Sequence, residues 1–348
     1  MKKYERIVQM LRHRIATGEY TSKLPTEREL MEEFGVSRVT VRKSIEILQK
    51  ELPLRRSKKG GTHIVLPQSE RSSNRQLVLL MPNSTHESIE IITGVETYFS
   101  NSNISLTVKF TDLSVKGERA ILEELLELDI AGFLIYPAAA SANRDLFLGI
   151  MERGIPLVFI DRSPARLICS SVSINNQQAA IDVVNHLYNQ GHRRIAYFAS
   201  ELKIQQSTME RLWGFSHAMS RHNLSVSKDN LFAFQGAAEM QRCFDRFFNA
   251  PIKATAVFCN DDVLAGYFIQ EAHNRGYRIP EDFSVVGIDD KAWRSAGVQL
   301  TTIRQPYREL GRRAAQIMEH QLENGTKETT KLYLDAELIV RNSVRSLK

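Results

Sequence analysis

Seven short apolar runs, separated by longer amphipathic stretches, recur between residue 76 and the C-terminus of this 348-residue chain. A short, nearly continuous apolar run is typical of a parallel strand buried on both faces, and amphipathic stretches suit helices that cover such a sheet. The pattern therefore predicts a doubly wound α/β fold. The runs are LVLLM (77–81), SLTVKF (105–110), GFLIY (132–136), PLVFI (156–160), RIAYF (194–198), TAVFC (255–259) and SVVGI (284–288).

This region is too long for one open sheet, because a single hydrophobic core stops growing at roughly 250 to 300 residues. We therefore expect two α/β lobes in residues 76–348. Residues 67–75, PQSERSSNR, carry no apolar side chain other than the proline and are predicted to be a linker. The predicted organisation is an N-terminal domain of residues 1–66, this linker, and a C-terminal domain of residues 76–348.

Two helix starts surround one tight turn in residues 24–51 of the N-terminal domain. Thr26 precedes Glu29 by three positions, a capping box in which each side chain satisfies a free amide at the helix start. Gly35 can adopt the left-handed backbone that ends this helix, and Ser37 is placed to cap the next one. The stretch therefore predicts a helix-turn-helix.

The second helix of this pair has one apolar face and one basic face. Val41, Ile45 and Leu48 recur at helical spacing, which predicts that they are buried. The side chains on the opposite face, near the start of the helix, are Arg38, Val39, Thr40, Arg42 and Lys43. A recognition helix meets base edges and phosphates in the major groove with this part of its surface.

Two further elements complete the N-terminal domain. Residues 4–17 form an amphipathic pattern that predicts a helix beneath the pair. Residues 54–65, LRRSKKGGTHIV, are predicted to be two short strands around a basic Gly-Gly turn. The expected domain is thus a winged helix-turn-helix.

The charge of the chain is divided unevenly between its two ends. Residues 1–75 hold 17 Lys or Arg against 9 Asp or Glu, a net charge of +8, whereas the rest of the chain has a net charge of −2. Phosphate contacts supply most of the sequence-independent affinity for nucleic acid, so a binding domain concentrates positive charge in this way. The distribution favours double-stranded DNA as a partner of the N-terminal domain.

Three stretches of this domain, PTEREL (25–30), FGVSRVTVR (34–42) and a basic wing ending in GTHIV (61–65), resemble the DNA-binding domain of the GntR family of bacterial repressors. The resemblance implies operator binding by Arg28, Ser37, Arg38, Thr40 and Arg42, with Lys59 and Gly60 at the wing tip. The chain departs from the family near Leu52, which is followed by Pro53, and at Lys59, where the family usually has glycine.

Polar side chains follow several of the apolar runs in the C-terminal domain. In open α/β sheets, ligands bind beyond the carboxyl ends of the strands, where these loops lie. Carboxylates, amides and arginine together suit a polyhydroxylated ligand, because each hydroxyl group both donates and accepts hydrogen bonds. The loop residues are Asn83, Ser84, Thr85, His86, Asp161, Arg162, Asn260, Asp261, Asp289 and Asp290.

Six further stretches resemble, in order and spacing, the effector domain of the LacI/GalR repressors. They are GHRRI (191–195), RLWGF (211–215), NDD (260–262), VVGIDD (285–290), LTTIRQP (300–306) and LIVRNS (338–343). The resemblance implies two α/β lobes around a cleft, similar to those of periplasmic sugar-binding proteins. Arg211, Asn260, Asp289 and, more loosely, Gln305 match sugar-contacting positions. The predicted effector site combines these four with Thr85, Asp161 and Arg162.

A GntR-type head on a LacI-type body resembles the arrangement of the arabinose-responsive repressor subfamily. It implies a cytoplasmic homodimer that binds operator DNA and is released from it by a monosaccharide, namely L-arabinose, L-fucose or a similar sugar. We expect no cofactor and no catalytic residue. Cys169, Cys243 and Cys259 lie too far apart for CxxC spacing and are predicted to be buried structural thiols.

An alternative function is a carbohydrate-active enzyme that uses two of Asp161, Asp261 and Asp289 as its carboxylate pair. The N-terminal domain argues against it, and no GxSxG, HExxH, Walker A or GxGxxG pattern occurs. A transport binding protein would require export, which the charged N-terminus does not support.

Individual residues also have structural interpretations. Asp161 and Asp289 could cap helices, and Arg211 could form a surface salt bridge. His192 is expected to hold a turn and not a metal ion. Trp213 and Trp293 are expected in a core or an interface more than against a sugar ring.

Overall fold

The computed structural model describes residues 3–16, 20, 24–51, 54–57, 61–64, 75–139, 142–164, 166–200, 206–251, 253–291, 294–295, 297–326 and 328–348. Their contacts divide the chain into two compact units, Met1–Asn74 and Arg75–Lys348. Each unit has a hydrophobic core of its own.

The first unit is a three-helix core with a two-stranded wing, as predicted. Its elements are α1 (Lys3–Ala16), α2 (Glu27–Phe34), α3 (Arg38–Glu51), β1 (Leu54–Ser57) and β2 (Gly61–Ile64). The two strands pair antiparallel, and Val41, Ile45 and Leu48 of α3 are buried against the apolar stripe of α1.

The predicted capping of the helix pair is confirmed in detail. Thr26 is the N-cap of α2 and forms a full capping box with Glu29, and Gly35 ends the helix at a φ of 59°. The backbone N–H of Leu24 donates to the carbonyl oxygen of Thr62 at 2.9 Å, which ties the wing to the entry of α2. Residues 52–53, Lys59, Gly60 and the linker up to residue 74 lie outside the described residues.

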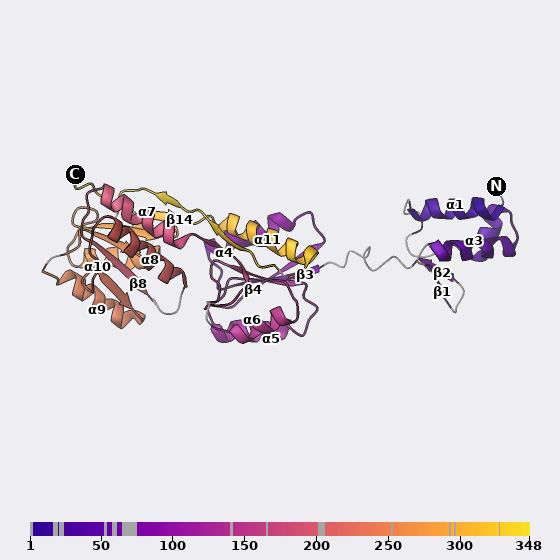
Figure 1. The fold of residues 1–348 in the computed structure, drawn as a ribbon, viewed down its shortest axis with the longest axis horizontal. Coiled ribbons are helices and arrows are strands. Elements are labelled where there is room, and N and C mark those ends of the chain that lie inside the picture. Colours follow the sequence, from indigo (N-terminus) through magenta and orange to yellow (C-terminus); the bar gives the residue numbers. More distant parts are fainter. Residues whose placement is uncertain are drawn as a thin grey trace. The chain divides into compact units, whose positions relative to one another are not determined.

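The second unit contains two six-stranded sheets. Lobe 1 is defined here by the sheet β4-β3-β5-β6-β7-β15 and lobe 2 by the sheet β9-β8-β10-β11-β14-β16 (Figure 1). The strands of lobe 1 are β3 (Arg75–Met81), β4 (Ile104–Phe110), β5 (Gly132–Ile135), β6 (Leu157–Ile160), β7 (Ser170–Ile174) and β15 (Lys331–Leu334). Those of lobe 2 are β8 (Ile195–Ser200), β9 (Leu231–Phe234), β10 (Ala256–Cys259), β11 (Ser284–Ile288), β14 (Thr301–Arg304) and β16 (Glu337–Ile339).

Helices cover both faces of each sheet, as expected for a doubly wound fold (Figure 1). In lobe 1, α4 (His86–Phe99) and α11 (Tyr307–Asn324) cover one face, and α5 (Val115–Leu125) and α6 (Arg144–Glu152) cover the other. In lobe 2, α7 (Asn176–Asn189) and α8 (Gln206–Arg221) lie opposite α9 (Gly236–Phe248) and α10 (Asp262–Asn274). A short hairpin, β12 (Arg294–Ser295) and β13 (Val298–Gln299), follows β11.

All seven apolar runs are strands, and all their pairings with one another are parallel. The apolar runs do not predict five further strands of the two sheets, namely β7, β9, β14, β15 and β16. Two of these, SSVSI and TTIR, are rich in Ser and Thr, so they lack the apolar continuity by which the other strands were found. The three cysteines are free and buried, as expected.

The chain passes between the lobes after β7, after β14 and after β15. The second passage sends α11 from the last inner strand of lobe 2 onto the sheet of lobe 1, where it packs against α4. Gly94 of α4 faces the backbone of Arg308, and Gly311 of α11 faces the backbone of Ile91. A methyl group at either glycine would fall well inside van der Waals contact with a carbonyl oxygen, so this close packing requires glycine. Among the helices that the structure describes, none is long and apolar enough to cross a lipid bilayer.

The packing of α4 on α11 predicts opposite effects for two glycine substitutions. Gly311→Ala should lower the free energy of unfolding by about 1–3 kcal/mol, because the added methyl group forces two helix backbones apart. Gly149→Ala is the matched control: this glycine also lies in a helix, a methyl group there would meet open space, and alanine should stabilise that helix by up to about 1 kcal/mol. Urea denaturation of both variants measures the difference, and equal effects would contradict the close packing.

Candidate functional site

A cleft with a volume of about 390 Å³ lies between the lobes of the second unit. All seven residues of the predicted effector site line it. Lobe 1 contributes Thr85, Asp161 and Arg162; lobe 2 contributes Arg211, Asn260 and Asp289; and Gln305 lies on the passage between β14 and α11. Lining residues that the sequence analysis did not assign to the site include Glu87, Tyr136, Phe234, Tyr267, Lys291 and Tyr307.

Arg211, on α8, is buried where lobe 2 lines the cleft. Its Nε–H donates to Asn176 Oδ1 at 2.8 Å, and its Nη1–H donates to the carbonyl oxygen of Asn260 at 2.7 Å. Only 5% of the residue is exposed, so the interpretation as a surface salt bridge is wrong. Because a guanidinium group has five N–H donors, further donors are available to a ligand.

The side chain of Asn260 is oriented by two neighbours. Tyr197 donates its hydroxyl hydrogen to Asn260 Oδ1 at 2.9 Å, and Asn260 Nδ2 donates to Thr208 Oγ1 at 3.3 Å. Since Tyr197 belongs to β8 and Thr208 to α8, the amide is locked from two elements of lobe 2. Such support fixes a binding group before any ligand arrives.

Asp289 sits at the carboxyl end of β11 in a backbone conformation with φ of 123°. Gln305 Nε2 donates to Asp289 Oδ1 at 2.7 Å, and the Nζ of Lys291 lies 3.4 Å from Oδ2. Burial raises the pKa of the Asp289 carboxyl, although the charges of Arg211 and Lys291 oppose this shift.

The alternative that Asp161 and Asp289 cap helices is wrong. The next helix after Asp161 is α7, which begins at Asn176, and the next helix after Asp289 is α11, which begins at Tyr307. Asp261 is the residue that caps a helix, because its Oδ1 accepts the Leu264 N–H at the start of α10 at 2.9 Å.

Arg162 and Gln305 each present a buried polar atom to the cleft. Among the described residues, neither Arg162 Nε nor Gln305 Oε1 has a hydrogen-bond partner. Arg162 lies over the ring of Tyr136 at 5.2 Å, and its Nε lies 3.4 Å from Asp161 Oδ2, an ion pair that compensates its charge without forming a hydrogen bond. Buried polar atoms without partners are rare in native proteins and point to a partner that binds from solution.

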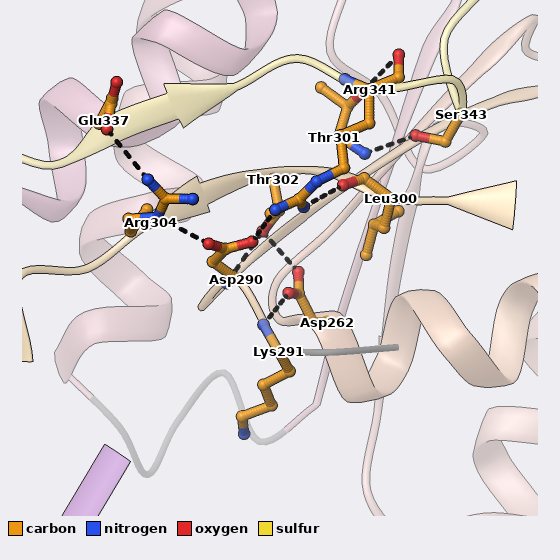
Figure 2. A network of polar contacts seen from close by, with 10 residues as sticks. All are labelled: Asp262, Asp290, Lys291, Leu300, Thr301, Thr302, Arg304, Glu337, Arg341 and Ser343. Carbon is orange, nitrogen blue, oxygen red and sulfur yellow. Dashed lines mark hydrogen bonds and ion pairs between the residues drawn. The ribbon is translucent and has the colours of Figure 1, made fainter. Parts of the chain in front are cut away.

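A polar network behind the cleft holds the loop that carries Asp289 (Figure 2). Asp262, fully buried at the start of α10, accepts the Thr302 hydroxyl hydrogen at 2.7 Å and the backbone N–H of Lys291 at 2.8 Å. Burial, together with the charge of Asp289, raises the pKa of Asp262 to about 7, and the two hydrogen bonds oppose the shift. Gly287 of β11 leaves the space that this carboxylate occupies.

The next residue of the loop, Asp290, is held by two arginines. Arg304 Nε donates to Asp290 Oδ2 at 2.7 Å, and Arg341 pairs with Oδ1 (Figure 2). Arg304 also lies 3.5 Å from Glu337 of β16. The network therefore ties the loop after β11 to β14, which precedes one passage between the lobes, and to β16, which follows another.

In the first unit, two candidate DNA contacts share one carboxylate. Glu27 at the start of α2 accepts from Arg38 Nε at 2.9 Å and from Arg42 Nε at 3.0 Å. Binding through Nε leaves the terminal amino groups of each guanidinium free to face a base or phosphate. The sequence did not predict this role of Glu27, because no spacing rule indicates contact with residues 11 and 15 positions away.

The other candidate DNA contacts in the described residues are at the surface. Arg28 is highly exposed and pairs only with Glu32, and Ser37 and Thr40 share a hydrogen bond of 3.0 Å between their hydroxyl groups. Lys43 differs from the expectation, since its Nζ lies 4.5 Å from the ring of Tyr4 and thus faces α1.

His192 and Trp213 have no part in the cleft. His192 is fully buried, its Nδ1 and Nε2 are bonded to Thr255 and to the carbonyl oxygen of Arg345, and burial lowers its pKa to about 4. Trp213 is 67% exposed on α8, so it is not a core residue; Trp293 lies outside the described residues. Within the described ranges, no three His, Cys, Asp or Glu residues are grouped to hold a metal ion.

Comparison with known proteins identifies the two units. Residues 3–64 match the model of the bacterial regulatory proteins of the gntR family, and residues 184–344 match that of the periplasmic binding protein-like domain. The chain therefore joins a gntR-type DNA-binding domain to a periplasmic-binding-protein-like effector domain.

Relatives along the whole chain are transcriptional regulators and not enzymes. An arabinose metabolism transcriptional repressor of Geobacillus stearothermophilus is 28% identical, with 100% of this chain and 99% of the relative covered. The HTH-type transcriptional repressor CytR of Escherichia coli K12 is also 28% identical, over 80% of this chain and 82% of the relative.

Solved structures share the fold of the second unit. A complex of the transcriptional regulator CelR with cellobiose matches with a TM-score of 0.68 and 22% identity over 88% of this chain and 91% of that chain. The regulator CcpA of Lactococcus lactis matches with a TM-score of 0.69 and 21% identity over 78% of this chain and 99% of that chain.

The shared carboxylate predicts a loss of sequence discrimination in Glu27→Gln. Affinity for upstream DNA of the gene should fall, because two unheld arginines must be ordered on binding, while affinity for random DNA should rise as a negative charge leaves the surface. The ratio of the two affinities, measured by fluorescence anisotropy, should drop about fivefold. Glu32→Gln is the control: it removes the same charge from the same helix but breaks only an exposed pair. An equal drop in this control would contradict the positioning role.

Asp262 predicts a pH-dependent stability difference. With a pKa raised from 3.8 to about 7, folded protein binds more protons than unfolded protein between these values, so its carboxyl removes stability as pH rises through this window. Asp262→Asn keeps an acceptor for the Lys291 N–H and abolishes this loss. The free energy of unfolding of the variant relative to wild type should therefore rise between about pH 4 and about pH 7 in urea titrations. A difference that stays constant with pH would show that Asp262 does not titrate there.

Proposed function

We infer that this regulator, which joins a gntR-type DNA-binding domain to a periplasmic-binding-protein-like effector domain, is a cytoplasmic transcriptional repressor released from its operator by a monosaccharide. The observation that carries this proposal is the cleft between the lobes, in which Gln305 Oε1 is buried without a hydrogen-bond partner among the described residues and Arg162 Nε has only an ion-pair contact with Asp161. One is a donor and the other an acceptor, so a ligand that both donates and accepts hydrogen bonds satisfies both.

The charge of the cleft supports an uncharged sugar. Two of its cations are paired within the cleft, since Arg162 lies 3.4 Å from Asp161, and Lys291 lies within 3.4 Å of both Glu87 and Asp289. The charge of the third, Arg211, acts on the Asp289 carboxyl. A phosphorylated or acidic sugar would have to displace these carboxylates, whereas a neutral one would not.

The choice of sugar follows the names of relatives. Because full-length relatives are named arabinose metabolism transcriptional repressors, L-arabinose is the first candidate, and L-fucose or a similar monosaccharide is the alternative. The proposed effector contacts are Thr85, Asp161, Arg162, Arg211, Asn260, Asp289 and Gln305.

On the DNA side, we propose contacts from Arg28, Ser37, Arg38, Thr40 and Arg42, with Lys59 and Gly60 at the wing tip. Val39 lies between Arg38 and Thr40 and is 76% exposed, so its apolar side chain suits contact with a thymine methyl group. Paired heads read half-sites separated by whole helical turns, so the working form is a homodimer.

Effector binding would change operator affinity through the two lobes. Since residues from both lobes line the cleft, a sugar favours the lobe arrangement in which they meet, and the dimer passes this change to its two heads. Coupling of this kind is typically worth about 1 to 3 kcal/mol, roughly 5- to 150-fold in affinity. No observation favours the carbohydrate-active enzyme: Asp261, one of its candidate acids, is used as a helix cap.

Gel-shift titration of upstream DNA with a panel of monosaccharides tests the proposal, and separable variants sharpen it. Arg42→Ala should weaken DNA binding and leave sugar binding intact. Lys43→Ala is its control. It removes the same charge at the next position, but the Lys43 side chain faces Tyr4 and not the proposed DNA surface. Arg211→Ala should bind DNA and ignore sugar.

Arg211→Ala leaves buried acceptors unpaired, so Asp289→Asn provides a second variant that keeps an acceptor for Gln305. It should also retain DNA binding and lose the sugar response. If no sugar changes the DNA affinity of the wild type, the effector proposal fails. If Lys43→Ala weakens DNA binding as much as Arg42→Ala, the assigned recognition face is wrong.

A further inference from the structure

One lysine makes an ion pair across the cleft. The Nζ of Lys291, in the loop after β11 of lobe 2, lies 3.3 Å from Glu87 Oε1 on α4 of lobe 1. The same ammonium group lies 3.4 Å from Asp289 Oδ2 in its own lobe. Lys291 therefore joins a lobe 1 carboxylate to the carboxylate that we assign to the effector.

The backbone of Lys291 is fixed in lobe 2, although its side chain reaches lobe 1. Its N–H donates to the buried Asp262 at 2.8 Å, and the preceding Asp290 is held by Arg304 and Arg341. Figure 2 shows the Lys291 side chain pointing away from this network. A change in the separation of the lobes must therefore break the contact with Glu87 and cannot be absorbed by the loop.

The other end of the bridge is equally well placed. Glu87 lies in the first turn of α4, where a carboxylate is stabilised by free backbone amides. Although burial opposes it, hydrogen bonds from Thr85 and the backbone together with Lys291 lower the pKa of Glu87. Asp289 and Glu87 raise the pKa of Lys291 against the effect of its burial. Both partners are thus charged at neutral pH.

The bridge is more than a surface ion pair. The side chains of Glu87 and Lys291 are 13% and 36% exposed, so solvent and salt screen them less than a pair in open water. The bridge is also compatible with an effector, because a carboxylate oxygen has two lone pairs and Asp289 Oδ2 can accept from both the ammonium group and a sugar hydroxyl.

We propose that Lys291 is a positioning residue that holds the two lobes together at the mouth of the cleft, and that its ion pair with Glu87 sets the affinity for the effector. The first part concerns lobe geometry alone. The second part rests on the proposed function, since it takes a sugar as the ligand of the cleft.

Lobe geometry is tested without any ligand, in the full-length protein. Spin labels at Lys116→Cys on α5 and Gln270→Cys on α10 report the distance between the lobes; both positions are exposed, and the three native cysteines are buried. Glu87→Gln and Lys291→Met should each lengthen or broaden the distance distribution. The double variant should go no further than Lys291→Met, and Lys291→Arg should keep the wild-type distribution because it restores the charge. High salt should shift the wild type towards Lys291→Met and leave that variant unchanged.

Effector affinity is measured by calorimetry with L-arabinose as the probe. Glu87→Gln removes the charge at the lobe 1 end of the bridge and keeps an acceptor for Thr85, so it should raise the Kd about fivefold. Lys291→Arg should stay within about twofold of wild type. In the Lys291→Met background, Glu87→Gln should have no further effect on Kd.

Three results are decisive. An unchanged distance distribution in Glu87→Gln overturns the proposal. A raised Kd in Lys291→Met with a normal Kd in Glu87→Gln also overturns it, because Lys291 would then act only on Asp289. If the wild type binds neither L-arabinose nor any other sugar of the panel, the proposed function fails, while the distance measurements still decide whether Lys291 holds the lobes.

Discussion

The near contact of two helix backbones, α4 and α11, is the constraint on which the second unit depends. Gly94 and Gly311 let the helices meet without intervening side chains, so a segment that leaves the sheet of lobe 2 completes the core of lobe 1. Because α11 begins two residues after Gln305, this packing also places Gln305 at the boundary between the lobes. A fold requirement and a ligand-binding position thus have the same cause.

The loop after β11 contains two consecutive residues with strained backbone conformations. Asp289 and Asp290 both have positive φ values, which residues with a Cβ adopt only when their surroundings impose them. Here the surroundings are Asp262 of α10, Arg304 of β14 and Arg341 in the segment after β16, which all bind the loop. The strain is offset by this network, and its effect is to direct Asp289 into the cleft and Lys291 towards the other lobe.

The two units use charge in the same manner. In the DNA-binding unit, Glu27 collects the guanidinium groups of Arg38 and Arg42 on one carboxylate. In the effector unit, Lys291 collects Glu87 and Asp289 on one ammonium group. In each unit, the shared charged group orients the side chains that would contact DNA or the effector. Side chains that are already oriented lose less entropy on binding.

Local chemistry in the sequence determined the element types, the capping of α2 and the helix-turn-helix, because these depend on residues a few positions apart. Resemblance to known repressors supplied four of the effector residues, and the loops after the apolar runs supplied Thr85, Asp161 and Arg162; all seven line one cleft. Strand β7 escaped the search for apolar runs, since Ser170 is buried through a hydrogen bond with Gln321, 151 positions away. Only the tertiary structure decided the burial of Arg211, the role of Glu27 and the bridge from Lys291 to Glu87. The physical reason is that each depends on partners brought together by packing, and no local spacing records such a meeting.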